Sequence, residues 1–271
     1  MRALPVLMYH HVSDDREVTV SQFEAQIKFL KENGWHTATL DEAYGHITGA
    51  KPLSGKNVLI TFDDGYADNW ICAWPVLNKY EMRAVVFVTT DRVTDNPVRP
   101  TVFEGAPSPD TLRDERGLSG FLSWPEISVM AESGVFEIGG HTHTHKDFDK
   151  RAEYRDIDGE LSESYALIAE RVGTKPAAMA WPWGFYKKGF IESAVKVGYK
   201  MLFTTRGGSN FPGSNPREIA RFKVKCGDVR WLEKRLKIYS MPCIGNLYGL
   251  LYGLDSKLKW TLLRLLGKNG G

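Results

Sequence analysis

Strand-type and helix-type segments alternate along most of this chain, and this alternation limits the possible folds more than any other feature. Apolar runs typical of buried strands span 4–12, 57–62, 84–89, 136–139, 178–181, 201–205 and 219–224. Segments with helical spacing of apolar residues lie near 21–33, 67–80, 124–133, 153–173 and 187–197. Strands that alternate with helices favour a parallel sheet, and this number of units predicts an α/β fold of the (β/α) barrel type, complete or partial.

Local signals predict the limits of the first helix and the buried face of a later one. Ser21 followed by Glu24 has the pattern of a capping box, so the first helix is expected to begin there and to end at Gly34. The apolar stripe of segment 153–173 consists of Ile157, Leu161, Tyr165, Ile168 and Val172. Its helical spacing predicts an amphipathic helix that covers the sheet.

Residues 91–120 interrupt the alternation. This segment carries Pro97, Pro100, Pro107 and Pro109 among scattered charges. A long segment without periodicity inside a compact domain is more often a functional loop than a neutral insertion. We therefore predict that it forms a lid or a substrate-contacting loop over the strand ends.

The chain from residue 229 onward has a different pattern. Basic residues alternate with apolar and aromatic ones between Arg230 and Tyr239 and again between Leu258 and Leu266. We predict a barrel over 1–228 followed by a basic amphipathic helical tail over 229–271. No apolar run in the tail approaches the ~20 residues that a membrane-spanning helix needs. Two interpretations remain open: the tail lies on a membrane surface, or it covers the core of the barrel.

Charge and cysteine content exclude two classes of protein. The formal net charge of the chain is only +2, whereas a surface that binds nucleic acid usually shows a pronounced basic excess, so no nucleic-acid partner is expected. The three cysteines are far apart in the sequence, at Cys72, Cys226 and Cys243. Because they lack a C-x-x-C pair, neither a disulfide framework nor a cysteine zinc site is predicted, and a reducing compartment fits best.

Two groups of polar residues directly follow predicted strands. Asp63 and Asp64 follow the run 57–62, and three histidines at alternate positions, His141, His143 and His145, follow the run 136–139. The carboxyl ends of parallel strands meet at one face of a barrel, so these groups are expected to lie together. Two imidazoles and one carboxylate can hold a divalent cation with positions left for water and substrate, while the other aspartate stays free to accept a proton.

These residues carry a family resemblance. Thr61-Phe62-Asp63-Asp64-Gly65 and His141-Thr142-x-x-His145 resemble the first two motifs of the polysaccharide deacetylases, carbohydrate esterase family four, whose NodB-homology domain is an irregular (β/α) barrel. The resemblance implies that Asp63 is the catalytic base and that Asp64, His141 and His145 hold the metal. His143 falls at a variable position of the motif and is interpreted as a loop or substrate-facing residue.

The third motif of the family is only partly present. Ala180-Trp181-Pro182-Trp183-Gly184 resembles Arg-x-Pro-Tyr-Gly, which implies that the backbone N–H of Trp183 donates to the oxyanion. Ala180 stands where the family has the arginine that orients the base. We predict Arg221 as its substitute, with a surface ion pair as the alternative. Asp228 is a candidate for a fourth motif, or simply the N-cap of the helix that follows.

The proton donor must also come from an unusual place, because the family uses a late histidine and no histidine follows His145 in this chain. Pro5-Val6-Leu7-Met8-Tyr9-His10-His11 resembles the opening of the poly-N-acetylglucosamine deacetylase branch, in which a histidine at the end of the first strand enters the active site. The resemblance gives this role to His10, whose imidazole suits protonation of an amine near neutral pH. His11, on the opposite face of the strand, is predicted to be structural or solvent-facing.

Together these features predict a metal-dependent carbohydrate N-deacetylase that hydrolyses the N-acyl, chiefly N-acetyl, group of an amino sugar in a glycan or a lipid-linked saccharide. The expected cofactor is a divalent metal, with Zn favoured and Co, Mn, Ni or Fe as alternatives. The expected location is cytoplasmic, with the tail as a peripheral contact to the inner membrane surface. The alternatives are an amidohydrolase that acts on a non-sugar amide, a non-catalytic sugar-binding relative and a membrane-associated scaffold.

Overall fold

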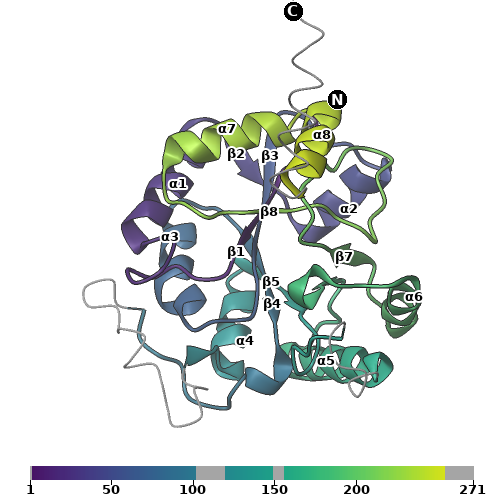
Figure 1. Ribbon diagram of the computed structural model, residues 1–271. Helices are drawn as coiled ribbons and strands as arrows, with labels where there is room; N and C mark the ends of the chain where they lie inside the picture. The colour runs from purple at the N-terminus through teal and green to yellow at the C-terminus, as the bar shows by residue number, and fades with distance from the viewer. Residues whose placement is uncertain (1, 102–119, 149–155, 254–271) are drawn as a thin grey trace, which may run out of the picture.

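One parallel sheet, curled into an irregular barrel, forms the centre of the computed structural model, which describes residues 2–101, 120–148 and 156–253 (Figure 1). The strands follow the order β7-β6-β5-β4-β3-β1-β8, and β2 pairs with the first half of β3. The strands are β1 (Val6–Tyr9), β2 (Trp35–Thr37), β3 (Lys56–Phe62), β4 (Ala84–Val88), β5 (Phe136–Gly140), β6 (Ala178–Ala180), β7 (Met201–Phe203) and β8 (Phe222–Lys223).

The two ends of this sheet meet, although by very few hydrogen bonds. Phe203 of β7 forms an isolated parallel bridge with Ile219, just before β8. Thr204 N–H donates to the Ile219 carbonyl and Ile219 N–H to the Leu202 carbonyl, both at 2.9 Å. The predicted irregular (β/α) barrel is confirmed, and its seam lies between β7 and β8.

Helices surround the sheet (Figure 1). They are α1 (Val20–Glu32), α2 (Leu40–Thr48), α3 (Trp74–Lys79), α4 (Trp124–Glu132), α5 (Ile157–Val172), α6 (Lys188–Val197), α7 (Val229–Tyr239) and α8 (Pro242–Gly253). A π-helical turn (Asn69–Ala73) precedes α3, and short 3₁₀ turns span Thr90–Arg92 and Pro182–Gly184.

The alternation of side chains along each strand separates the core into layers. Leu7 of β1 and Ile60 of β3 point outward into an apolar cluster beneath α1, α3, α4 and α7. Val6 of β1 and Leu59 of β3 point into the barrel and join a second cluster that includes Phe87. Successive residues of a strand point to opposite sides of the sheet. The residues directly after each strand continue this alternation, so their position in the sequence determines whether their side chains point into the barrel or away from it.

The first helix begins two residues earlier than predicted, so the capping box of Ser21 and Glu24 is wrong. Thr19 is the N-cap, with extended φ and ψ of −74° and 164°. Its Oγ1 accepts from the Gln22 N–H at 3.3 Å, and Gln22 Oε1 accepts from the Thr19 N–H at 3.1 Å. The pairs Thr19–Gln22 and Ser21–Glu24 both have the sequence of a capping box, and the extended backbone at Thr19 shows that the first pair forms it.

Other differences concern short elements. Strand β2 and helix α2 were not predicted, because β2 has only three residues and α2 only nine. The predicted helix 67–80 is interrupted by the π-helical turn, and of the predicted strand 219–224 only β8 is regular. The lid predicted for 91–120 lies mostly outside the described residues, since 102–119 are not described.

Helix α7 packs against the barrel. Leu232, Leu236 and Tyr239 are at most 2% exposed and belong to the outer apolar cluster. This packing favours the interpretation in which the tail covers the core, and membrane contact gains no support from it. None of the helices in the described ranges has the length and apolar content needed to cross a bilayer. The pattern at 258–266 lies outside the described residues.

The cap of α1 provides a test of the local fold. Thr19→Ala should lower the free energy of unfolding by about 1 kcal/mol, because it leaves an N–H of the first turn without its acceptor. Ser21→Ala is the matched control and should stay within about 0.5 kcal/mol of the unmodified protein. Urea denaturation followed by circular dichroism measures both values. A larger loss for Ser21→Ala than for Thr19→Ala would contradict this assignment of the cap.

Candidate functional site

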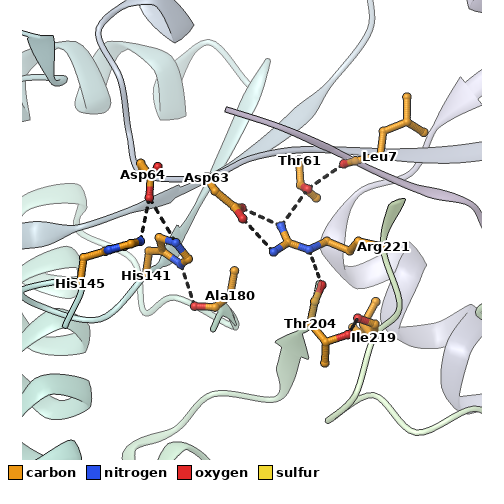
Figure 2. A network of polar contacts seen from close by, with 10 residues as sticks. All are labelled: Leu7, Thr61, Asp63, Asp64, His141, His145, Ala180, Thr204, Ile219 and Arg221. Atoms are coloured by element: carbon orange, nitrogen blue, oxygen red, sulfur yellow. Dashed lines mark hydrogen bonds and ion pairs between the residues drawn. The ribbon is translucent and has the colours of Figure 1, made fainter. Parts of the chain in front are cut away.

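Inward-facing positions just after β1, β3 and β5 and just before β8 form the site, and Figure 2 shows the residues from β3, β5 and β8. Along β3 the inward residues Leu59 and Thr61 are followed by Asp63, two positions further on. By the same alternation His141 follows β5, His10 follows β1, and Arg221 precedes β8 on the pocket side. Segments far apart in the sequence therefore place their polar side chains at one end of the barrel, as expected for parallel strands.

Asp64, His141 and His145 form a group whose ligand atoms all lie within 4.8 Å of one another. Asp64 Oδ1 is 3.3 Å from His141 Nε2 and 3.0 Å from His145 Nε2. All three side chains are at least 90% buried. Burial by itself would raise the pKa of Asp64, but the two imidazoles outweigh it and hold that pKa far below its usual range.

The residues present fit a divalent cation. His141 Nδ1 donates to the Ala180 carbonyl at 2.8 Å, which leaves the lone pair of Nε2 directed toward Asp64. Asp64 Oδ1 is buried and has no hydrogen bond of good geometry within the described part of the chain. A buried acceptor without a donor beside two imidazole nitrogens is explained by a cation between them. Two imidazoles and a carboxylate form a ligand set used by hydrolytic metal sites.

The backbone around this cluster is strained. Five residues other than glycine have positive φ in the described ranges, and four of them are Asp64 (75°), Thr142 (62°), His145 (57°) and Trp183 (59°). Such residues cost free energy and persist where the surrounding structure fixes them, often at functional sites. Here the strain turns two metal-ligand candidates, Asp64 and His145, toward one point.

Asp63 and Arg221 form a bidentate ion pair (Figure 2). Arg221 Nη1 donates to Asp63 Oδ1 at 2.6 Å, and Nη2 donates to Oδ2 at 2.8 Å. The Arg221 side chain is fully buried and that of Asp63 is 3% exposed. The burial of both side chains excludes a surface ion pair for Arg221, and the functional substitution for the arginine missing from the 180–184 motif stays a prediction.

Further contacts hold the Arg221 guanidinium in place. Nε donates to the Thr204 carbonyl at 2.8 Å, and Nη1 also donates to Thr61 Oγ1 at 3.2 Å. The guanidinium carbon lies 5.6 Å from the centre of the Phe87 ring. Burial by itself would raise the pKa of Asp63, but the neighbouring Arg221 charge outweighs it, so the pKa lies below its usual value. Asp63 is thus a carboxylate of fixed orientation.

His10 borders the same cavity. Its Nδ1 is buried and has no hydrogen-bond partner within the described ranges. Burial lowers the pKa of His10, while the nearby Asp63 and Asp64 charges oppose that change. The backbone carbonyl of His10 accepts from Asn69 Nδ2 at 3.0 Å, which fixes the end of β1. The His10 side chain is half-buried in the lining of the cavity.

Trp183 is the exposed member of the site. It lies in the 3₁₀ turn after β6, its side chain is 69% exposed, and its ring packs edge-on against His145 at 5.3 Å between centroids. Gly184 follows with φ 73°, and a Cβ there would collide with the Thr205 side chain. The sequence Pro182-Trp183-Gly184 therefore forms a turn that only glycine can complete, and it places the Trp183 backbone at the edge of the cavity.

The remaining histidines of the two motifs lie outside the metal group. His143 Nδ1 is 2.9 Å from Thr90 Oγ1, and its Nε2 is 3.4 Å from Glu163. His11 Nδ1 is 2.7 Å from Asp68 Oδ2, and its ring stacks on Tyr66. Both residues have structural contacts, in agreement with their interpretation from the sequence.

One supporting residue was missed by sequence analysis. Glu160 of α5 is 8% exposed and accepts from the backbone N–H groups of His143 and Thr144, at 3.0 and 2.8 Å. It thereby holds the loop that carries His145. A signal existed, because Glu160 lies on the same helical face as Ile157 and Leu161, and a carboxylate on a buried face needs partners. Asp228, by contrast, is the N-cap of α7 and accepts from the Arg230 N–H at 2.9 Å.

A cavity of about 470 Å³ opens over these residues. Its floor contains Asp63, Asp64, His10 and the two ligand histidines. The wall is formed by Met8, Trp181, Trp183, Thr205, Gly207, Arg221, Phe222, Lys223, Lys225, Trp231, Arg235 and Tyr239. Helix α7 therefore forms part of the wall, which the predicted separation at residue 228 did not anticipate.

The Asp63–Arg221 pair predicts a specific loss of stability. Arg221→Gln should lower the free energy of unfolding of the metal-free protein by about 3–5 kcal/mol, because it leaves a buried carboxylate without its partner. Asp63→Asn combined with Arg221→Gln should cost less than the sum of the single changes. Chemical denaturation of all four proteins measures this coupling, and strict additivity would contradict it.

The pH dependence of this coupling has a definite sign. In the unmodified protein the lowered pKa of Asp63 contributes stability above the ordinary carboxyl pKa, and that stability is lost as the pH falls through the lowered value. In Arg221→Gln the guanidinium charge no longer opposes burial, so the pKa of Asp63 rises and its ionised form contributes less stability above the ordinary carboxyl pKa. The difference in unfolding free energy between the two proteins should therefore grow with pH. A pH-independent difference would contradict the proposed pairing.

Comparison with known proteins agrees with this geometry. The polysaccharide deacetylase family model matches residues 50–202, which include Asp63, Asp64, His141, His145 and Trp183. YxkH of Bacillus subtilis (strain 168), named for the same family, is 30% identical over 226 residues, which are 83% of this chain and 72% of that protein.

Two further proteins are similar at lower identity. The poly-beta-1,6-N-acetyl-D-glucosamine N-deacetylase of Escherichia coli (strain K12) is 26% identical over 236 residues, 74% of this chain but only 34% of the length of that protein. The solved structure of IcaB from Ammonifex degensii has a TM-score of 0.69 and 26% identity, and the match covers 83% of this chain and 92% of that one. The sequence match, the barrel and the site thus agree, and the chain belongs to the polysaccharide deacetylase family.

Proposed function

We propose that this protein hydrolyses the N-acetyl amide of N-acetylglucosamine residues in a glycan, with β-1,6-linked N-acetylglucosamine as the first substrate to test. The observation that carries the proposal is the pairing of a buried, fixed carboxylate, Asp63, with the adjacent ligand group of Asp64, His141 and His145 at the base of one cavity. The name of the Escherichia coli relative supplies the sugar and the linkage. The Asp63–Arg221 pair argues against a non-catalytic sugar-binding protein, because binding alone needs no oriented base.

The three ligand residues would hold a divalent cation, and we propose Zn because two imidazoles and one carboxylate form a common hydrolytic zinc site. When bound, the cation would polarise the amide carbonyl and increase the acidity of a water molecule. Co, Mn, Ni and Fe suit the same ligands.

Asp63 is the proposed general base. Both of its oxygens accept from Arg221, but each carboxylate oxygen has a second lone pair, so one remains available for the proton of the attacking water. The lowered pKa keeps Asp63 ionised over the working pH range. Arg221 fixes the direction from which the proton is taken, which is the contribution of an orienting residue.

His10 and Trp183 are proposed for the later events. The Trp183 backbone N–H would donate to the oxygen of the former carbonyl as negative charge develops on it. His10 would then transfer a proton to the departing sugar amine, because its half-buried imidazole lines the same cavity as Asp63. The products are acetate and a glycan with a free amine.

The two aspartates should separate into different roles. Asp63→Asn should retain the metal and lose about 10²–10⁴-fold in kcat, because it removes the base and no ligand. Asp64→Asn should lose metal affinity as well. Metal content measured on the purified proteins, together with acetate release from β-1,6-linked N-acetylglucosamine oligomers, tests both. Metal loss in Asp63→Asn but not in Asp64→Asn would reverse the roles assigned to the two aspartates. Hydrolysis of non-sugar amides without acetate release from the oligomers would overturn the proposed substrate class.

His10 should appear in the pH dependence of the reaction. A general acid must be protonated, so kcat/KM should fall as the pH rises through the pKa of His10, which burial places below its ordinary value of 6.5. His10→Asn should lower kcat/KM by about 10²-fold and remove this basic limb. His143→Asn, a change outside the cavity, is the control. A basic limb that persists unchanged in His10→Asn would show that another group is the acid.

A further inference from the structure

We infer that the indole of Trp183 is a binding platform for the pyranose ring that carries the acetamido group of the substrate. This inference rests on the proposed deacetylation and specifies its substrate class, an N-acetylated aminopyranoside with an open apolar ring face. The side chain acts separately from the Trp183 backbone N–H, which any residue except proline would keep. Substitutions at this position therefore change the platform and retain the proposed oxyanion donor.

Trp183 differs from the other tryptophans by its exposure. Its side chain is 69% exposed, the highest value among the large hydrophobic side chains of the described ranges. The other tryptophans in these ranges are buried or partly buried. Single exposed apolar residues are normal on a protein surface, but Trp183 lines the cavity that contains Asp63 and the ligand group. An exposed aromatic ring on a ligand cavity is suited to a ligand with an apolar face.

Contacts place the indole beside the ligand group. Its ring centroid lies 5.3 Å from that of His145, and His145 Nε2 is 3.0 Å from Asp64 Oδ1. In an amino sugar the acetamido nitrogen is bonded directly to the pyranose ring. A sugar whose acetamido carbonyl reaches the ligand group therefore has its own ring, rather than that of a more distant sugar, nearest to the indole.

The contact with His145 leaves most of the indole open. The two rings are inclined at 65° and meet edge to face, so their contact area is small. The face of an aromatic ring is electron-rich and favours contact with C–H groups. A pyranose with equatorial substituents presents axial C–H groups on its ring faces. Such a face matches the indole in shape and polarity, whereas a linear amide has no comparable flat surface.

The turn around Trp183 holds the indole in place before any sugar binds. Trp183 has φ 59° and ψ 1°, a left-handed conformation that few residues other than glycine adopt. The turn is closed by the Gly184 N–H, which donates to the Trp181 carbonyl at 3.0 Å. Trp181 anchors the turn, since its side chain is only 1% exposed. A platform fixed in this way loses little conformational freedom on binding, which favours affinity.

Two substrates that share the scissile amide test the platform on the full-length Zn-loaded protein. Methyl N-acetyl-β-glucosaminide carries the pyranose ring, and N-acetylethanolamine carries the same acetamido group and a neighbouring hydroxyl without a ring. The ratio of kcat/KM for the glycoside to kcat/KM for the linear amide, measured by acetate release, should fall by about fivefold or more in Trp183→Ala. One lost aromatic contact has an effect of this order. The change should lie in KM for the glycoside, because the platform contacts the sugar in the ground state and the transition state alike.

Matched variants assign this effect to the aromatic ring. Trp183→Phe keeps an aromatic face, so it should lose less of the preference for the glycoside than Trp183→Ala does. Leu247→Ala is the control, because Leu247 of α8 is 50% exposed and does not line this cavity, and it should leave the ratio unchanged. All three variants should retain the metal. Loss of metal from Trp183→Ala would assign the indole to support of His145 and overturn the platform.

Fluorescence gives a second measurement, which does not depend on turnover. Acrylamide quenches exposed tryptophans, and Trp183 is the most exposed tryptophan in the described ranges. In Zn-loaded Asp63→Asn, where hydrolysis is slow, saturating glycoside should reduce the quenching, and this protection should disappear when Trp183→Phe is added. N-acetylethanolamine should give no protection in either protein. Equal protection with and without Trp183 would place the sugar elsewhere and overturn the inference.

The outcomes separate this inference from the proposed function. Acetate release from the glycoside with a ratio that Trp183→Ala leaves unchanged overturns the platform, while the deacetylase proposal stands. Absence of acetate from the glycoside and from β-1,6-linked oligomers overturns the proposed reaction. In that case the quenching titration of the otherwise unmodified Zn-loaded protein decides the platform: protection that Trp183→Phe removes supports it, and absence of protection overturns it.

Discussion

The buried ion pair between Asp63 and Arg221 is the interaction on which the site depends. It joins the end of β3 to the start of β8 across the open end of the barrel, close to the seam at the Phe203–Ile219 bridge. Neither charge would be tolerated at this depth without the other. The pair therefore stabilises the least regular part of the sheet and, at the same time, fixes the carboxylate beside the ligands of the proposed cation.

Much of this site could be predicted from sequence because it follows from the two-residue period of parallel strands. A polar residue directly after a buried strand lies at the carboxyl end of the barrel. Its side chain faces inward if it is an even number of positions from an inward-facing residue of that strand. That reasoning places Asp63, His141 and His10 in one cavity. Arg221 is different: its candidacy came from a gap in the 180–184 motif, and only the folded chain shows it reaching Asp63 from a strand 158 positions further along the sequence.

The features that could not be predicted from the sequence depend on tertiary contacts between distant segments, and no sequence motif marks these contacts. Glu160 supports the His145 loop from a helix, and its helical stripe shows only that a carboxylate is buried, not what it contacts. The start of α1 was misplaced because two capping boxes overlap in the sequence, and backbone conformation decides between them. The strained φ angles of Asp64 and His145 are likewise imposed by the assembled loops, since neither residue favours that conformation alone.

Segment 221–225 connects the Asp63 carboxylate with the outer lining of the cavity. Arg221 pairs with Asp63, and Lys223 and Lys225 line the cavity at the next two alternate positions. Helix α7 also lines this cavity, while its buried face, Leu232 and Leu236, packs into the outer core. Substitutions on the cavity-lining face of α7, a helix that the sequence assigns to a tail, can therefore reshape the cavity without changing the ligands of the proposed cation.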